Sequence, residues 1–168
     1  MPLLHHAVLR IAEVTREVVV VLAPRAEAPP VPPGLTVRFV RDASEGEGPL
    51  EGALAGLVAV ESSRAVIAGG DMPGLSTAVL TEMLRVAVEA AVDAVALQDG
   101  DGFRPLPLVV AVEPAQVAAR ALRHDGEQRL RALPQALRTA VIDETTWRAL
   151  DPHGETLRDV DLPADLSH

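Results

Sequence analysis

The sequence predicts an α/β protein whose mostly parallel sheet is covered by helices on both faces. Three observations support this fold class: continuous runs of β-branched residues, helical periodicity between those runs, and a hydrophobic content of 48% with only 2% aromatic residues. Apolar strands without alternation are typical of sheets buried on both faces. Strands that alternate with helices imply right-handed crossovers between parallel strands. We expect the 168 residues to form one domain over residues 1–168.

The helices follow from apolar residues at helical spacing. A first helix is expected within Pro2–Arg16, where Pro2 suits the first turn. Ser76 is the expected N-cap of a helix that reaches about Ala91. The other predicted helices run from the glycine-rich loop to near Ser62, then over Pro114–Arg123, Glu127–Leu137 (with Pro134 as a kink or end) and Glu144–Leu150. Trp147 in the last of these is the expected packing anchor.

The strands are short apolar runs bounded by turn signals. Between the first two, the proline-rich stretch Pro24–Gly34 predicts a stiff surface connector. Asp99–Gly102, with the sequence DGDG, predicts a tight turn after the fourth strand. The predicted strands are Glu17–Ala23, Leu35–Arg41, Arg64–Gly70, Asp93–Gln98, Pro107–Val112 and Thr139–Asp143.

Composition excludes several function classes. The chain has no cysteine and no lysine, which excludes disulfides, thiolate chemistry, a P-loop lysine and a Schiff base. A net charge of −9 argues against a surface for nucleic acid or anionic membranes. The histidines have no spacing typical of a zinc or iron site. The absence of a membrane span or leader pattern makes the cytoplasm the expected compartment.

Asp71 is a single carboxylate directly after a predicted strand, in the stretch AVIAGGDMPGLS. Ligands of doubly wound sheets bind at the carboxyl ends of strands, so this acid stands where such a site is expected. One interpretation is that Asp71 favours the start of the next helix. The other is that it is a ligand for Mg²⁺ bound to the phosphates of a nucleotide.

Two further segments could contribute to such a site. In the tail, Asp159 and Asp161 are two residues apart, so an extended segment would present both on one face. If the tail returns to the strand ends, Asp161 and Asp71 could share one Mg²⁺; otherwise it is a solvated acidic tail. The loop DASEGEGPLEG contains glycines that let a ligand approach the backbone closely, although many such loops bind nothing.

In combination, these segments resemble the molybdenum cofactor guanylyltransferases and their nucleotidyltransferase relatives. The resemblance rests on GPLEGALAGLVAV, GGDMPGLSTAVLTEML, GEQRLRALPQAL and WRALDPHGETLRDVDLPADL, and it covers nearly the whole chain. It implies a Rossmann-like three-layer α/β/α nucleotidyltransferase fold. It also implies an enzyme that transfers GMP from Mg-GTP to molybdopterin-bound molybdenum and releases pyrophosphate.

The resemblance also implies roles for particular residues. Asp71 matches the Mg²⁺ ligand that follows the central strand, and Asp161 matches the position in the tail that completes the metal site. Three arginines lie where they could face the phosphate of the acceptor, although each alone could be a solubilising side chain. These are Arg104, Arg129 and Arg131. The residues that match the nucleoside-binding loop are Asp42, Gly48, Pro49, Leu50 and Gly52.

The sequence departs from the family at its front. The family opens with an apolar strand and a glycine-rich loop that grips the triphosphate, and this sequence begins at the helix that normally follows. We therefore expect a sheet without its first strand, with apolar strand edges left open. Either the natural protein is longer, which we favour, or this is a reduced, non-catalytic relative.

Alternatives in substrate and partner remain open. The GPL loop favours GTP, whereas two aspartates in the tail favour the cytidylyl relatives. A relative that uses another phosphorylated acceptor, or a catalytically inactive module that binds nucleotide or a cofactor-assembly protein, is the other hypothesis. A homo-oligomer could cover the open sheet edge.

Overall fold

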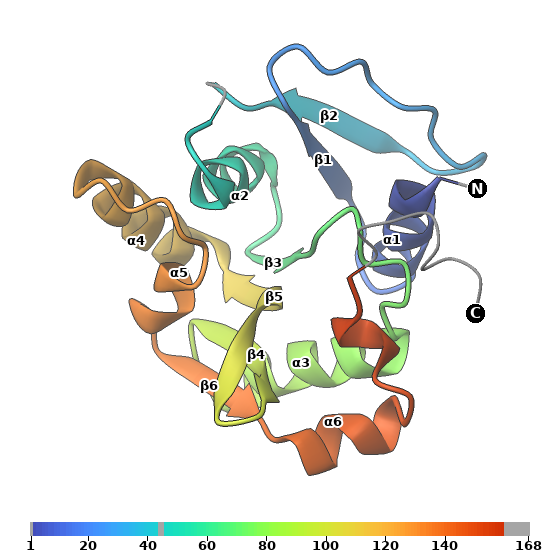
Figure 1. The fold of residues 1–168 in the computed structure, drawn as a ribbon, viewed down its shortest axis with the longest axis vertical. Coiled ribbons are helices and arrows are strands. Elements are labelled where there is room, and N and C mark those ends of the chain that lie inside the picture. Colours follow the sequence, from blue (N-terminus) through green and yellow to red (C-terminus); the bar gives the residue numbers. More distant parts are fainter. Residues whose placement is uncertain (1, 44–45, 160–168) are drawn as a thin grey trace.

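The structure is an α/β fold in which helices pack around two sheets (Figure 1). It is a computed structural model, and it describes residues 2–43 and 46–159. The strands are β1 (Val18–Leu22), β2 (Val37–Arg41), β3 (Arg64–Ile67), β4 (Ala94–Asp99), β5 (Gly102–Ala111) and β6 (Thr139–Ile142). The helices are α1 (Leu3–Ala12), α2 (Pro49–Ala59), α3 (Thr77–Glu89), α4 (Val112–His124), α5 (Ala132–Gln135) and α6 (Glu144–Leu150), followed by the 3₁₀ turn η1 (Glu155–Leu157). The predicted α/β class is confirmed.

The strands run mostly in one direction, as the sequence analysis predicts, but β5 makes the larger sheet mixed. β1 and β2 form a parallel pair, and the larger sheet has the strand order β3-β5-β4-β6. In the larger sheet β4 and β6 are parallel, but β5 runs antiparallel to both β3 and β4. The tight turn between Asp99 and Gly102 is the reason that β5 runs antiparallel to β4. It joins β4 directly to β5, and so short a connection can only link antiparallel strands.

β5 is longer than the predicted strand. It begins at Gly102 and therefore includes Pro105 and Pro107. The register between β4 and β5 shifts between Val95 and Leu97, opposite the segment that holds both prolines. Proline cannot donate a backbone hydrogen bond and is tolerated in sheets mainly at edges and irregularities. The register shift therefore lets this strand remain inside the sheet.

The helix predicted over Glu127–Leu137 is largely absent, and only the single turn of α5 forms. The carboxylate of Glu127 accepts the backbone N–H groups of Gln128 at 3.0 Å and Arg129 at 2.9 Å. Such local side-chain bonds give the backbone an alternative to helical hydrogen bonds. The segment before α5 is consequently a loop, which lies against the glycine-rich loop described below.

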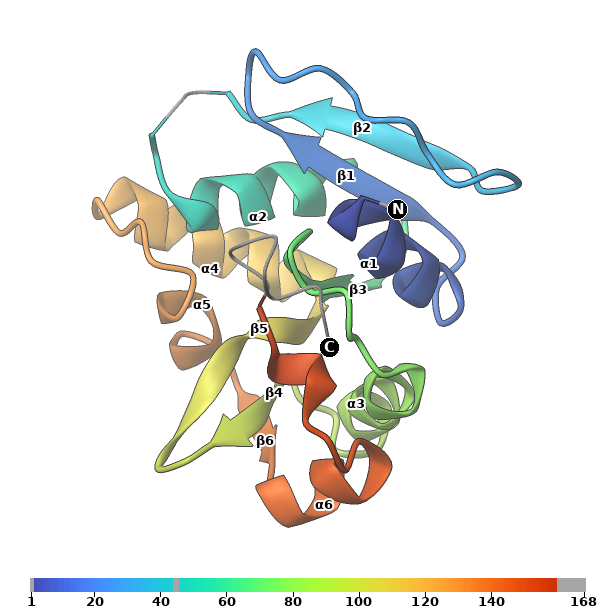
Figure 2. The same cartoon turned by 45° about the vertical axis from the view of Figure 1, so that its right-hand side comes forward.

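The larger sheet is buried on both faces, as its apolar strands predict. Side chains of β4 alternate between two cores: Val95 and Leu97 face α1, α3 and α6, and Ala94 and Ala96 face α2, α4 and α5. Figure 2 shows helices on both sides of this sheet. Trp147 is confirmed as a packing anchor: it is 1% exposed, and its indole N–H donates to the carbonyl of Gln98 at 3.0 Å. No described helix is long and apolar enough to cross a membrane.

Glu17 joins the two sheets at the amino ends of β1 and β3. Its carboxylate accepts the backbone N–H groups of Glu61 at 2.8 Å and Ser62 at 2.9 Å, and the Ser62 hydroxyl at 2.9 Å. It also pairs with Arg38 of β2 at 2.7 Å. Burial opposes ionisation, but the hydrogen bonds from Ser62, Glu61 and Arg38 hold the pKa of Glu17 below its ordinary value. One carboxylate thus connects β1, β2 and the segment that leads into β3.

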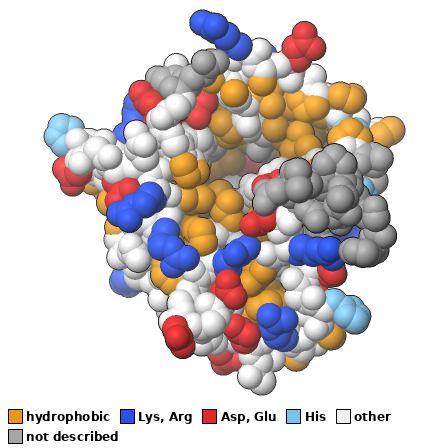
Figure 3. Space-filling model, viewed as in Figure 1, with side chains coloured by type: hydrophobic (Ala, Val, Ile, Leu, Met, Phe, Trp, Pro, Cys, Tyr) orange, Lys and Arg blue, Asp and Glu red, His pale blue; other side chains and the backbone are white. Residues whose placement is uncertain are grey.

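An apolar cavity of about 540 Å³ separates β1 from β3. Both strands line it, together with α1 and α2. Within residues 2–43 and 46–159, β1 pairs only with β2 and β3 only with β5, so each strand has one edge without a strand neighbour. Figure 3 shows the mouth of the cavity as a hollow bordered by apolar side chains. The sequence-based expectation of open apolar strand edges agrees with this arrangement.

Replacing Glu17 with glutamine should destabilise the fold by about 1–3 kcal/mol, because several donors lose a charged acceptor. Since the folded pKa of Glu17 is lowered, its contribution is present above the unfolded pKa, about 4.3. It is lost as the pH falls through the folded pKa. Urea unfolding of both chains at pH 7 and at decreasing pH checks this. The difference should shrink in acid, and Glu27→Gln, at an exposed glutamate, should have no comparable effect.

Candidate functional site

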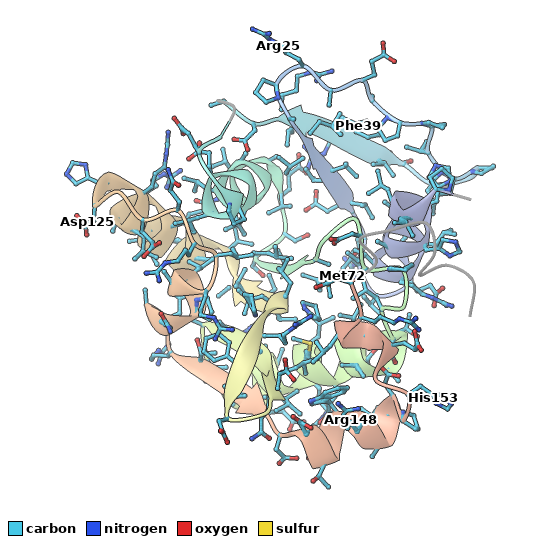
Figure 4. The ribbon with its side chains drawn as sticks, viewed as in Figure 1. Arg25, Phe39, Met72, Asp125, Arg148 and His153 are labelled. Atoms are coloured by element: carbon cyan, nitrogen blue, oxygen red, sulfur yellow. The ribbon has the colours of Figure 1, made fainter. Side chains whose placement is uncertain are left out.

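Asp71 lies in a tight turn directly beyond the carboxyl end of β3. The N–H of Met72 donates to the carbonyl of Gly69 at 3.3 Å, and the N–H of Gly69 contacts the Met72 sulfur at 3.3 Å. Met72, labelled in Figure 4, is 1% exposed and anchors the turn in the core. Asp71, in contrast, is exposed. A Cβ atom at Gly69 would approach the Met72 side chain to 3.4 Å, so the turn is closely packed at that position. The turn therefore presents the carboxylate on a fixed backbone.

The carboxylate of Asp71 does not start the helix that follows. Ser76 is the N-cap of α3, and its hydroxyl accepts the N–H of Val79 at 3.4 Å, as the sequence predicts. The first turn of α3 contains no acidic residue. Asp71 also has no hydrogen bond or ion pair with residues 2–43 and 46–159. Asp71 therefore lies outside the first turn of α3 and caps no described helix, and its carboxylate is exposed.

The glycine-rich loop is held against the segment that precedes α5. Gly48 has a φ of 84°, and a Cβ there would lie 2.9 Å from the Gln128 carbonyl oxygen. The N–H of Leu50 donates to the same carbonyl at 3.2 Å, and the Leu50 side chain is 1% exposed. Leu50 thus anchors the loop in the core, and its backbone donor already has an acceptor. Gln128 was not identified from the sequence, because it contacts the loop through its backbone carbonyl and not through its side chain.

The structure brings Asp42 to the same loop. Asp42 follows β2, and its N–H donates to the carbonyl of Leu22 at 2.8 Å. A Cβ at Gly52 would lie 3.6 Å from Asp42 Oδ2, within ordinary contact distance. Pro49 is the first residue of α2, and both Pro49 and Gly52 line the mouth of the apolar cavity. Gly69, beside Asp71, lines the same cavity. The predicted loop and the Asp71 turn therefore border one hollow.

The three candidate arginines have protein partners. Arg104 donates to the carbonyl of Leu157 at 2.8 Å and to Asp159 at 3.1 Å. Arg129 pairs with Glu127 at 2.9 Å and is 81% exposed at its side chain. The guanidinium of Arg131 stacks over the Phe103 ring, 4.8 Å from its centroid. A role for any of them in binding an acceptor phosphate stays a prediction.

The C-terminal segment returns to the loop that carries Asp71. A Cβ at Gly74 would lie 2.7 Å from the carbonyl oxygen of Glu155, so the two backbones are in close contact. The N–H of Ser76 donates to the hydroxyl of Thr156 at 3.1 Å. Asp159 is fixed by Arg104, as described above. The tail thus runs toward the strand ends up to residue 159, and Asp161 lies outside the described residues.

Asp151 holds this segment in place. It is 8% exposed, and it accepts the N–H groups of Thr156 at 2.7 Å and Glu155 at 3.2 Å. Burial opposes ionisation, but hydrogen bonds from Thr156, Glu155 and Gly154 keep the pKa of Asp151 below its ordinary value. The Asp-Pro pair after a helix is a turn signal. The contact between Thr156 and Ser76 spans 80 residues and could not be predicted from the local sequence.

Comparison with known proteins identifies the family. The model of the MobA-like NTP transferase domain matches residues 1–141. The chain belongs to this family. It is 29% identical over 166 residues to the probable molybdenum cofactor guanylyltransferase of Chloroflexus aggregans, covering 98% of this chain and 77% of the relative. It is 30% identical over 119 residues to the molybdenum cofactor guanylyltransferase of Desulfosudis oleivorans, covering 71% of this chain and 58% of that protein.

Two solved structures show a fold similar to that of this chain. Molybdopterin-guanine dinucleotide biosynthesis protein A from Archaeoglobus fulgidus matches with a TM-score of 0.65 at 22% identity, covering 77% of this chain and 64% of that one. The 2-C-methyl-D-erythritol 4-phosphate cytidylyltransferase of Thermus thermophilus matches with a TM-score of 0.71 at 17% identity, covering 98% and 85%. These matches confirm the Rossmann-like nucleotidyltransferase fold that the sequence analysis predicts.

In this member of the MobA-like family, the carboxylate of Asp71 is a suitable ligand for Mg²⁺, but one carboxylate alone does not form a complete metal site. A free carboxylate oxygen is the ligand type that Mg²⁺ prefers, and Mg²⁺ commonly uses one or two carboxylates plus phosphates and water. No group of three or more histidine, aspartate or glutamate residues placed to hold a metal ion occurs within the ranges 2–43 and 46–159. The described residues therefore supply one candidate ligand, Asp71.

Replacing Asp151 with alanine should loosen the segment of residues 155–159, because two or more backbone donors lose a charged acceptor at a buried position. We expect about 1–3 kcal/mol of destabilisation in urea unfolding and faster amide exchange at Glu155 and Thr156. Asp125→Ala, at an exposed aspartate after α4, is the matched control. Unchanged exchange at Thr156 would contradict the role of Asp151.

Proposed function

We propose that this chain is a guanylyltransferase of molybdenum cofactor biosynthesis, which transfers GMP from Mg-GTP to molybdopterin cofactor. The observation that carries the proposal is the exposed carboxylate of Asp71 beyond β3, which caps no helix and has no described protein partner. Relatives named molybdenum cofactor guanylyltransferase at about 30% identity support the choice of reaction. The cytoplasm is the compartment in which we expect it to act.

The reaction joins an acceptor phosphate oxygen to the α-phosphorus of GTP. The bond from that phosphorus to the oxygen bridging to the β-phosphate breaks, and its electrons leave with pyrophosphate. Asp71, together with Asp161 of the tail, would hold Mg²⁺, which would supply positive charge beside the phosphates. The fixed turn of Gly69–Met72 keeps the Asp71 carboxylate in position, so that little reorganisation accompanies the reaction.

The loop from Gly48 to Gly52 would contact the nucleoside. Its glycines let a base approach the backbone, and its anchoring by Leu50 and Gln128 makes the contact surface rigid. The GPL sequence of this loop favours guanine. The aspartate pair of the tail, of which Asp159 is engaged with Arg104, favours a cytidylyl-type reaction as the second candidate. Comparing GTP with CTP decides between them.

Replacing Asp71 with asparagine should lower Mg²⁺-dependent pyrophosphate release from GTP and molybdopterin by about 100-fold or more, while the chain stays folded. Equilibrium dialysis with GTP and CTP, each with and without Mg²⁺, measures nucleotide choice on the unchanged chain. Asp101→Asn, at the exposed turn between β4 and β5, is the matched control and should leave both measurements unaltered.

Turnover by Asp71→Asn at the level of the unchanged chain would show that Asp71 is not a metal ligand. Mg²⁺-dependent binding of CTP in preference to GTP would replace the guanylyl assignment with the cytidylyl one. Binding of GTP without any turnover would favour the inactive nucleotide-binding module.

A further inference from the structure

A buried carboxylate lies at the start of α2, within the sequence GPLEG of the glycine-rich loop. Glu51 is 6% exposed, although an acidic side chain is rarely buried so fully unless it is paired. An acid in the first turn of a helix is favourable, but a solvent-exposed acid would serve that purpose equally well. The burial of Glu51 therefore points to a specific partner.

That partner is Arg123, in the last turn of α4. Its Nε atom forms an ion pair with Oε2 of Glu51, and its Nη2 atom lies 3.5 Å from Oε2 of Glu47. Removing a carboxylate from water is costly, and a charged partner offsets that cost. Within the ranges 2–43 and 46–159, Glu51 forms no other ion pair. One guanidinium therefore binds two carboxylates that come from the same loop.

The two carboxylates lie on either side of the centre of the loop. Glu47 precedes residues 48–50 and Glu51 follows them directly. Residues 48–50 belong to the segment that is proposed to contact the nucleoside. Arg123 thus bridges the loop across this contact segment, from a helix that is distant in sequence.

The part of the loop before residue 49 has the greatest backbone freedom. Gly46 and Gly48 have φ values of 78° and 84°, a region that glycine enters far more readily than other residues. Glu47 lies between them. Ordering such a segment costs conformational entropy, and a segment that is ordered in advance does not lose this entropy when the ligand binds. The ion pair of Glu47 therefore restrains the loop where restraint has the largest effect on binding.

The rest of α2 is attached to α4 independently of Arg123. The two helices lie side by side (Figure 2). The carbonyl of Gln128, after α4, accepts the N–H of Leu50 at 3.2 Å. Toward the other end of α2, the side-chain amide of Gln116 donates to the carbonyl of Leu57 at 2.8 Å. Loss of Arg123 should therefore free the loop without releasing the whole helix.

We propose that Arg123 is a positioning residue, which holds residues 46–52 in the conformation that binds the nucleotide by bridging Glu47 and Glu51. This inference rests on the proposed function, in which the loop contacts the nucleoside. The positive charge of Arg123 also offsets the two carboxylates, which would otherwise repel the phosphates of a bound nucleotide.

Replacing Arg123 with glutamine should raise the dissociation constant of Mg-GTP about tenfold in equilibrium dialysis. Because the restraint acts on binding and not on the reacting phosphates, KM for GTP should rise by a similar factor, while kcat changes by less than about twofold. Arg123→Lys keeps the charge without the planar fork and should recover part of the affinity. Arg120→Gln, at an exposed arginine of the same helix, is the matched control and should bind GTP like the unchanged chain.

A double variant separates positioning from stability. Arg123→Gln alone destabilises the chain, because it leaves the buried carboxylate of Glu51 without its partner. Combining it with Glu51→Gln removes both charges and should restore stability in urea unfolding. The bridge is still absent, so the dissociation constant of GTP should stay raised about tenfold. Glu47→Gln, at the more exposed partner, should weaken GTP binding about threefold and leave the stability unchanged.

Amide hydrogen exchange tests the loop in the absence of nucleotide. In Arg123→Gln, exchange at Glu47, Gly48 and Leu50 should be about tenfold faster, with no comparable change at Leu57. If the unchanged chain binds neither GTP nor CTP, the proposed function fails, and this measurement alone decides whether Arg123 holds the loop.

Three results would overturn the proposal. The first is an unchanged affinity for GTP in Arg123→Gln, or a double variant that regains the affinity of the unchanged chain. The second is equal acceleration of exchange along all of α2, which would mean that Arg123 stabilises the fold in general and does not position the loop. The third is a fall in kcat at constant KM, which would place Arg123 in the reaction itself.

Discussion

Burial of the β4–β5 pair on both faces is the constraint on which the rest of the fold depends. Val95, Leu97, Val109 and Val110 are all 0% exposed, and neighbours along each strand face opposite cores. Both faces must therefore be covered by helices, which leaves the loops at the strand ends as the places where polar chemistry can occur. The Asp71 turn and the glycine-rich loop lie in such positions.

Asp71 differs from the acids that hold the fold together, because its carboxylate has no hydrogen bond or ion pair among the described residues. Glu17, Asp143 and Asp151 each accept backbone N–H groups, and these hydrogen bonds lower the pKa of each side chain. Glu17 links the two sheets, Asp143 caps the start of α6, and Asp151 holds the C-terminal segment. A carboxylate that is exposed, rigidly placed and unpaired contributes little to folding. Its exposed place directly beyond the carboxyl end of β3 is where a ligand is expected in such a sheet.

Much of the fold could be predicted from the sequence because local signals agree with it. The runs that become β1, β2 and β3, and the Ser76 cap, follow from residue type and spacing. The direction of β5 follows from the predicted turn at Asp99–Gly102 and not from the composition of the strand itself. The loop before α5 was not predicted, and it forms because Glu127 bonds its own neighbours. Asp71 stood out in the sequence, whereas the contact from Thr156 to Ser76 exists only after folding.

The strands that flank the cavity are built for the interior of a sheet. Val18–Leu22 and residues 65–67 are apolar without alternation, which is typical of strands with neighbours on both edges and helices on both faces. The helices are present, but all of β3 and most of β1 are only half-buried, in contrast to residues 94–97 of β4 and 107–110 of β5. These two strands are therefore less buried because each has an edge without a strand neighbour among the described residues, and not because helices are missing from their faces. The same Glu17 that bonds the amino ends of these strands to each other keeps them aligned on either side of the cavity.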